Sequence, residues 1–144
     1  MQHTVDLATM PSAVADFARY KSVIQNCSPK TVNEYVLDLR TFFCFFLAKE
    51  RGIDPASPAF LELDIRDITL EQIAAVTAEQ IYEFMMYTSD VRANLWAAKA
   101  RKLSAIKALY KYLTVKRGLI EHNPAADIES PRPKKSLPKV LSLE

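Results

Sequence analysis

The chain has 144 residues, of which 49% are hydrophobic and 25% are charged, and its formal net charge at pH 7 is +2. That length suits one compact domain, and the composition is typical of a soluble globular protein. No apolar run approaches the roughly 20 residues of a membrane-spanning helix, and residues 1–10 lack the pattern of a secretory signal. With only two cysteines, interpreted as reduced thiols, the chain is predicted to be cytoplasmic and free of any membrane association.

Charge is distributed unevenly along the chain. Residues 53–90 hold eight acidic side chains and one basic side chain, whereas residues 91–120 hold eight basic side chains and no acidic one. Positive charge gathered in one segment favours a surface that binds a polyanion. A solvated helix face explains the same pattern equally well, so charge alone leaves both interpretations open. The basic side chains are Arg92, Lys99, Arg101, Lys102, Lys107, Lys111, Lys116 and Arg117.

Hydrophobic periodicity predicts helices in the first half of the chain. A first helix is expected over residues 11–25, and a second helix is expected from the N-cap Ser28 and Pro29 to about residue 51. Residues 53–68 are predicted to form a loop with a short extended piece. The core face of the first helix is predicted to consist of Val14, Phe17, Ala18 and Ile24.

Capping signals predict the helices of the second half. Thr69 and Thr77 are each followed three residues later by glutamine, a capping box that starts a helix. The last long helix is expected over residues 94–118, and Gly52 and Gly118 are predicted to be left-handed C-cap residues. The helix after Thr77 is expected to direct Ile81, Phe84 and Met85 inward, with Met86 as a further candidate. The core stripe of the last helix is predicted to be Leu103, Ile106, Leu109, Tyr110 and Leu113.

These elements predict an all-α bundle of four to five helices over residues 11–129. Residues 1–10 are expected to be disordered. Residues 130–144 are rich in proline and lysine, which predicts an extended C-terminal tail that serves as a linker toward a domain absent from this chain.

Catalytic and metal-binding groups are hard to assemble from this sequence. The two histidines, His3 and His122, are distant from each other in sequence, and together with Cys27 and Cys44 they do not form a zinc-ligand pattern. The two glycines lie at helix ends, so no glycine-rich phosphate loop is present. We therefore expect no cofactor, no metal and no self-contained enzyme.

Two helices carry side chains that suit DNA. Lys30, Thr31 and Asn33 stand at the amino-terminal end of the second helix, where backbone donors and the helix dipole favour phosphate. The last helix presents Arg101 and basic neighbours for base edges or phosphates. A well-capped helix and a solubilising face would account for these residues without DNA. The alternative prediction is a helical protein–protein interaction module whose basic helix meets an acidic partner.

Three segments, residues 28–43, 100–113 and 123–141, suggest a family. In this order they resemble the amino-terminal core-binding domain of the tyrosine site-specific recombinases of the Xer and phage-integrase type. The resemblance implies a SAM-like bundle that forms one half of a C-shaped clamp on a double-stranded recombination site. Carried over position by position, it implies DNA contacts from Lys30, Thr31, Asn33 and Arg40 on the second helix, and from Ala97, Lys99, Arg101 and Lys102 on the last.

The resemblance also implies that cleavage of DNA belongs to a separate catalytic domain. Full-length members cleave DNA through a tyrosine, assisted by arginines, a lysine and histidines of a carboxy-terminal domain, and they assemble as tetramers on DNA. The His-x-x-Arg box is absent here, and neither Tyr110 nor Tyr112 is a candidate nucleophile. We therefore expect a parent recombinase that is an enzyme, and a chain that by itself is a non-catalytic monomer. Chromosome dimer resolution and mobile-element integration both remain open as its role.

Overall fold

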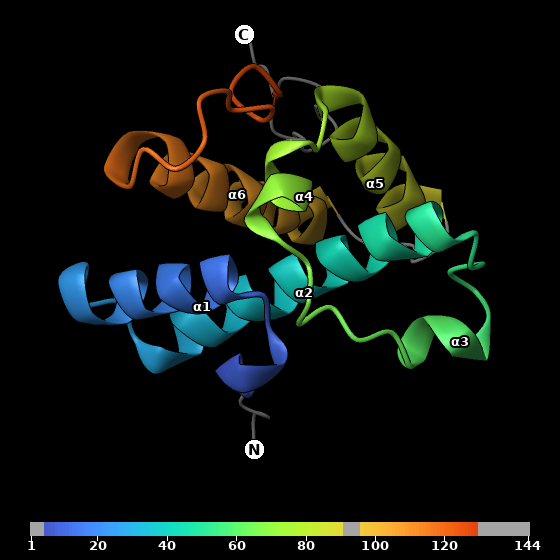
Figure 1. The fold of residues 1–144 in the computed structure, drawn as a ribbon, viewed down its shortest axis with the longest axis horizontal. Helices are drawn as coiled ribbons and strands as arrows, with labels where there is room; N and C mark the ends of the chain where they lie inside the picture. The colour runs from blue at the N-terminus through green and yellow to red at the C-terminus, as the bar shows by residue number, and fades with distance from the viewer. Residues whose placement is uncertain (1–4, 91–95, 130–144) are drawn as a thin grey trace, which may run out of the picture.

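A computed structural model describes residues 5–90 and 96–129, and all regular secondary structure in those ranges is helical (Figure 1). The prediction of an all-α bundle is thus confirmed. None of the described helices combines the length and the apolar character needed to cross a membrane. The elements are η1 (Leu7–Thr9), α1 (Ser12–Arg19), η2 (Tyr20–Ile24), α2 (Pro29–Arg51), α3 (Pro58–Leu61), α4 (Leu70–Ala74), α5 (Ala78–Asp90), α6 (Trp96–Lys111) and η3 (Tyr112–Lys116).

The long central helix α2 begins and ends where its capping residues predict. The Ser28 hydroxyl accepts a hydrogen bond from the Thr31 amide at 3.2 Å, and Pro29 occupies the first turn, where no amide donor is lost. Gly52 ends the helix with φ of 69°, a left-handed conformation that costs a glycine little. The amide of Ile53 then closes the turn on the Ala48 carbonyl at 2.8 Å.

Both predicted capping boxes are confirmed. The Thr69 amide donates to Gln72 Oε1 at 2.8 Å, and the Gln72 amide donates to Thr69 Oγ1 at 3.1 Å. Thr77 and Gln80 repeat the arrangement at 2.9 and 3.2 Å. The prediction for residues 53–68 is wrong in one respect, because the expected extended piece is absent and the single helical turn α3 forms instead.

Two of the predicted helices end in a π-helical turn. α1 continues into η2 and α6 continues into η3, and each turn is closed by a residue with positive φ, Asn26 at 55° and Gly118 at 60°. A π turn adds a residue to the helical turn and rotates the next residues off the 3.6-residue stripe. Ile24, predicted to face the core, is consequently 69% exposed. The predicted start of the last helix near Asn94 lies outside the described residues.

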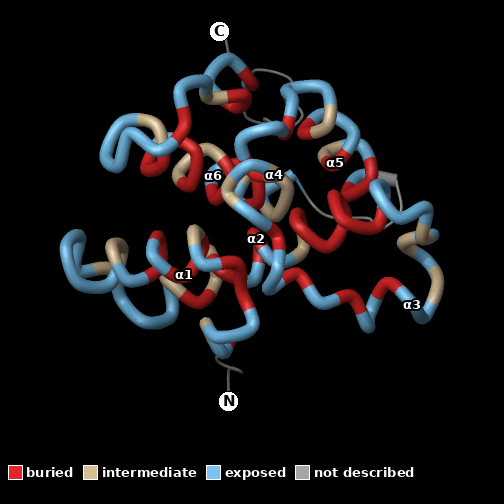
Figure 2. Tube along the Cα trace, in the orientation of Figure 1, coloured by how far each residue is buried: buried red, intermediate tan, exposed pale blue. Residues whose placement is uncertain are grey.

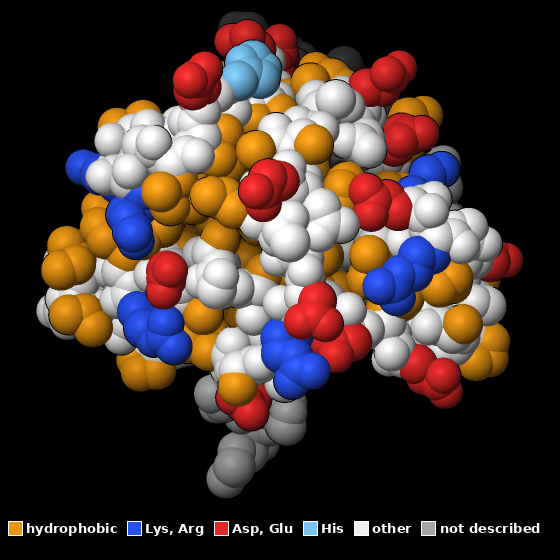
Figure 3. Space-filling model, viewed as in Figure 1, with side chains coloured by type: hydrophobic (Ala, Val, Ile, Leu, Met, Phe, Trp, Pro, Cys, Tyr) orange, Lys and Arg blue, Asp and Glu red, His pale blue; other side chains and the backbone are white. Residues whose placement is uncertain are grey.

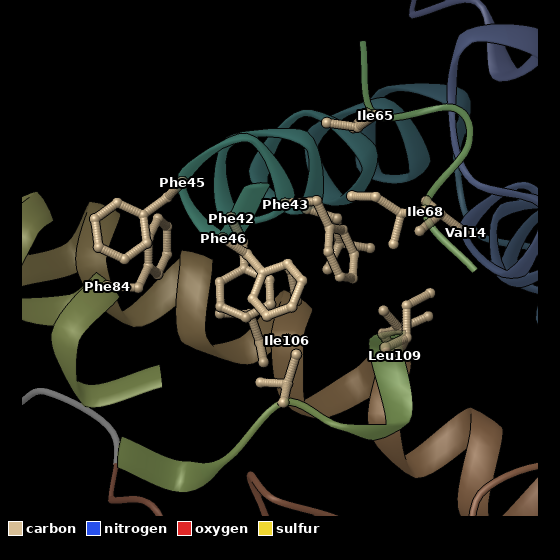
Figure 4. Close-up of a cluster of buried hydrophobic side chains, with 14 of the residues drawn as sticks. Val14, Phe42, Phe43, Phe45, Phe46, Ile65, Ile68, Phe84, Ile106 and Leu109 are labelled. Atoms are coloured by element: carbon tan, nitrogen blue, oxygen red, sulfur yellow. The ribbon is translucent and has the colours of Figure 1, made fainter. Parts of the chain in front are cut away.

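The core is built around α2, which packs against α1, α5 and α6 (Figure 2). Phenylalanines of α2 meet Phe84 of α5 and the apolar stripe of α6 (Figure 4). The five predicted core residues of the last helix are all fully buried, as are Ile81 and Phe84. Met86 is 64% exposed, so its inward orientation was wrongly predicted: it falls beside, not on, the stripe that Ile81, Phe84 and Met85 define.

The expectation that residues 1–10 are disordered is wrong for residues 5–10. Val5 and Met10 are buried, the turn η1 forms between them, and the Val5 amide donates to the buried Asn33 side chain at 2.8 Å. Residues 1–4 and the predicted linker, residues 130–144, lie outside the described residues.

Candidate nucleic-acid interface

An open groove of about 460 Å³ lies where α6 crosses α2 and the short α3. It brings together side chains that the sequence separates by about 60 residues, among them Arg40, Arg101 and Lys102 from the predicted DNA contacts. The lining consists of Leu37, Asp38, Arg40, Thr41 and Cys44 from α2, Phe60 and Leu61 from α3, and Arg101 and Lys102 from α6.

Asp38 organises the charges of this groove. The residue is 3% exposed, and its carboxylate accepts hydrogen bonds from Arg101 Nε at 2.9 Å and Arg101 Nη2 at 3.1 Å, while Lys102 Nζ lies 3.6 Å from it. Arg101 and Asp38 thus form a bidentate pair, with two hydrogen bonds to the two carboxylate oxygens, which is the strong geometry for such pairs.

Arg101 is the member of this cluster that solvent reaches. Half of its side chain is exposed, whereas Lys102 is 6% exposed. Hydrogen bonding to Asp38 raises the pKa of Arg101, and the nearby carboxylate of Glu34 acts in the same direction. Of the five N–H donors of a guanidinium, Asp38 occupies two. The remaining donors are therefore held in a fixed orientation at the surface.

The exposed stripes of α2 and α6 adjoin at Arg101. Lys30, Glu34 and Leu37 follow each other at helical spacing along α2, and Glu34 lies near enough to Arg101 to influence its charge. On α6, Ala97 and Arg101 share one exposed face. The two predicted surfaces therefore border one another.

Three of the predicted DNA contacts lie away from the surface where the exposed faces of α2 and α6 adjoin. Asn33 is buried and holds the Val5 amide, and Lys102 is buried beside Asp38. Lys99 is two positions from Arg101, about 200° around the helix, and its Nζ donates to Ser89 Oγ of α5 at 3.1 Å.

Thr31 and Arg40, two further predicted contacts, are exposed. The Thr31 hydroxyl accepts from Ser28 at the start of α2. Arg40 lies beside Cys44 at the edge of the groove, where burial raises the pKa of the Cys44 thiol and the Arg40 charge partly opposes that effect.

Sequence reasoning missed Asp38, although a signal was present. Asp38 is an acidic residue beside Leu39 on the apolar face of α2, and it is the only acid among the eight residues from Tyr35 to Phe42. A buried carboxylate needs a paired cation, which would have directed attention to the basic helix.

Ion pairs connect the basic helix α6 to the central helix α2. The ion pairs described for α6 join Arg101 and Lys102 to Asp38 of α2, at 2.9 and 3.6 Å. Acidic and basic side chains are interspersed over the face that carries α4 (Figure 3).

Neither tyrosine at the end of α6 offers an accessible nucleophile. Tyr110 is fully buried, its hydroxyl donates to the Ile73 carbonyl at 2.6 Å, and burial raises its pKa. Tyr112 is buried and its hydroxyl accepts from Arg117 at 3.0 Å. No group of three or more potential metal ligands occurs in the described part of the chain. Cys27 and Cys44 are both free thiols.

Fold and groove together define a small helical domain with a half-exposed arginine that a buried carboxylate holds in place. The chain is 34% identical over 134 residues to the tyrosine recombinase XerC of Caldanaerobacter subterraneus subsp. tengcongensis, covering 93% of this chain and 38% of that protein. It is 31% identical to the tyrosine recombinases XerC of Chlamydia muridarum, over 91% of this chain and 42% of that protein, and of Chlamydia pneumoniae, over 92% and 42%.

Over about nine tenths of its length the chain is similar to these tyrosine recombinases, which confirms the resemblance seen in the sequence. It spans about two fifths of the length of these relatives. No family model matches the chain, and no solved structure does.

Proposed function

We propose that this chain binds double-stranded DNA sequence-specifically, as the core-binding part of a tyrosine recombinase. The observation that supports it most is the pairing of Arg101 with the buried Asp38, which fixes a half-exposed guanidinium on a surface shared by α6 and the start of α2. The similarity to proteins named tyrosine recombinase XerC supports the same proposal.

In this proposal the guanidinium of Arg101 enters the major groove of the DNA, and the start of α2 binds the phosphate backbone. The free donors of Arg101 suit the paired acceptors of a guanine or a phosphate oxygen. Lys30 stands in the first turn of α2, where the positive end of the helix dipole adds to its charge. We assign direct contacts to Lys30, Thr31, Arg40, Ala97 and Arg101. Asn33 and Lys102 then support the surface from within, and Lys99 binds Ser89 of α5 instead.

Replacing Arg101 by alanine is expected to weaken binding by about 1–3 kcal/mol on a preferred duplex, if the arginine reads a base. The discrimination between the preferred and a random duplex should fall with it. The measurement is a fluorescence anisotropy titration across a series of salt concentrations, on a duplex selected from a random pool. Arg51→Ala removes the same side chain from the exposed far end of α2 and serves as the matched control.

Two results would contradict the proposal. One is an Arg101→Ala protein that is folded by circular dichroism and binds DNA as the Arg51→Ala control does. The other is a native chain that shows no duplex affinity at low salt. An acidic polypeptide that binds more tightly than duplex DNA would favour the protein-interaction module instead.

The whole recombinase extends the proposal beyond this chain. We infer that the domain forms one half of a clamp around a recombination site and meets neighbouring protomers in a tetrameric synapse. The chain by itself is a monomer that needs no cofactor. Chromosome dimer resolution and mobile-element integration are both forms of DNA recombination that such a domain would serve by holding the duplex in a defined register.

The chain alone is expected to leave supercoiled DNA uncut. Tyr110 is buried and Tyr112 is engaged by Arg117, so neither hydroxyl reaches a phosphate. The measurement is incubation with a supercoiled plasmid, followed by an agarose gel and by denaturing electrophoresis for covalent adducts. An adduct would overturn the expectation, and its loss in Tyr82→Phe would assign it to Tyr82, whose side chain is exposed.

A further inference from the structure

A second groove, of about 390 Å³, lies between the two π turns η2 and η3. The ends of α1 and α6 lie at the same side of the molecule (Figure 1), and the rings of Tyr20 and Tyr112 meet there with centroids 4.9 Å apart. Three lysines, Lys21, Lys111 and Lys116, border this aromatic floor, and no acidic residue lines the groove. None of these residues belongs to the DNA contacts inferred above.

The lysines of this groove are not neutralised by the domain. Within residues 5–90 and 96–129, neither the Lys111 nor the Lys116 side chain makes a hydrogen bond or an ion pair, and both are exposed. Lys21 is held in place, since its Nζ donates to Gln25 at 2.7 Å and lies 5.2 Å from the centroid of the Tyr35 ring. A cleft that gathers uncompensated positive charge concentrates anions.

The groove continues the exposed stripe of α6 on which Arg101 stands. Helical spacing carries this stripe from Arg101 through Ser104 and Ala108 to Lys111, and Ala108 and Lys111 line the groove. Ten residues of α-helix separate Arg101 from Lys111 by about 15 Å. The major groove of B-DNA is about 12 Å wide. An arginine in the major groove therefore leaves Lys111 at the level of a flanking phosphate backbone.

We propose that this second groove seats a backbone segment of the same duplex, with Lys111 and Lys116 on phosphate oxygens and Lys21 behind them. This rests on the proposed function, because it assumes that Arg101 faces DNA. The ligand is the repeating phosphate of the backbone, since lysine is a point charge that recognises phosphate without reading a base. The groove then adds affinity to every duplex alike and sets how far along the DNA the domain extends.

The test is the double variant Lys111→Gln with Lys116→Gln, measured beside the native chain on a selected and on a random duplex. Each phosphate contact contributes about −0.9 to the slope of log affinity against log salt. The slope should therefore become shallower by about 1.8, with equal loss of affinity on both duplexes. The matched control is Lys49→Gln with Arg51→Gln, which removes two exposed positive charges from the far end of α2.

The outcomes separate this proposal from the function on which it rests. A native chain without duplex affinity overturns both. A native chain that binds, with a double variant whose slope matches the control, overturns the second groove alone. Lysines near a helix end also offset the helix dipole. If that is their whole role, the double variant lowers the melting temperature, keeps the native salt slope, and again overturns the groove.

Discussion

Replacing Asp38 by alanine is expected to lower the free energy of unfolding by about 3–5 kcal/mol. Asp38 and Lys102 are both buried, and Arg101 is hydrogen-bonded to the same carboxylate. Removing the acid takes an anion away from a buried ammonium and from a guanidinium that is hydrogen-bonded to it, which is costly in a low-dielectric interior. The measurement is urea denaturation monitored by circular dichroism. The dependence of the unfolding free energy on urea concentration should be the same for both proteins.

The matched control for this experiment is Asp16→Ala. Asp16 also pairs with an arginine, Arg19 at 3.2 Å, but both side chains are about half exposed or more, so the loss should be about 0–1 kcal/mol. The double variant Asp38→Ala with Lys102→Met removes the buried acid and the buried base together. It should therefore be more stable than Asp38→Ala alone. Equal losses from Asp38→Ala and Asp16→Ala would show that the buried cluster does not stabilise the crossing of α2 and α6.

Replacing Phe84 by alanine is expected to cost about 3–5 kcal/mol, the range for truncating a fully buried aromatic ring. The ring is 0% exposed and packs edge-on against Phe42 of α2, with centroids 5.2 Å apart. Figure 4 shows it at the junction of α2 with α5, also beside Phe45. Its loss opens a cavity between the two helices, which thermal and urea denaturation would both detect.

Two companions make the Phe84 result interpretable. Phe84→Leu keeps most of the buried volume and should lose clearly less stability than Phe84→Ala. Tyr82→Ala removes an aromatic ring from the exposed side of the same helix, where the expected change is within about 0.5 kcal/mol. A Phe84→Ala protein as stable as Tyr82→Ala would mean that α5 is not anchored through this ring.

Local features of this protein could be predicted from its amino-acid sequence. The N-cap Ser28, the two capping boxes and the glycines Gly52 and Gly118 set helix ends through contacts within a few residues, so pattern alone found them. The stripe from Leu103 to Leu113 was also found, because helical periodicity reveals which face must be buried. The resemblance to the recombinase family was also recognisable, because three short segments that resemble it follow one another in the family's order.

Which polar groups meet depends on the tertiary structure. The Asp38–Arg101 pair spans 63 positions and the Val5–Asn33 bond spans 28, and neither partner indicates the other in the sequence. Periodicity assigns a residue to a face of its own helix, but it does not give the angle at which α6 crosses α2. That crossing turned Lys99 toward α5, buried Lys102, and left Arg101 exposed on the shared surface. Long-range packing fixes the relative rotation of the helices, and charge pairing is set by that rotation.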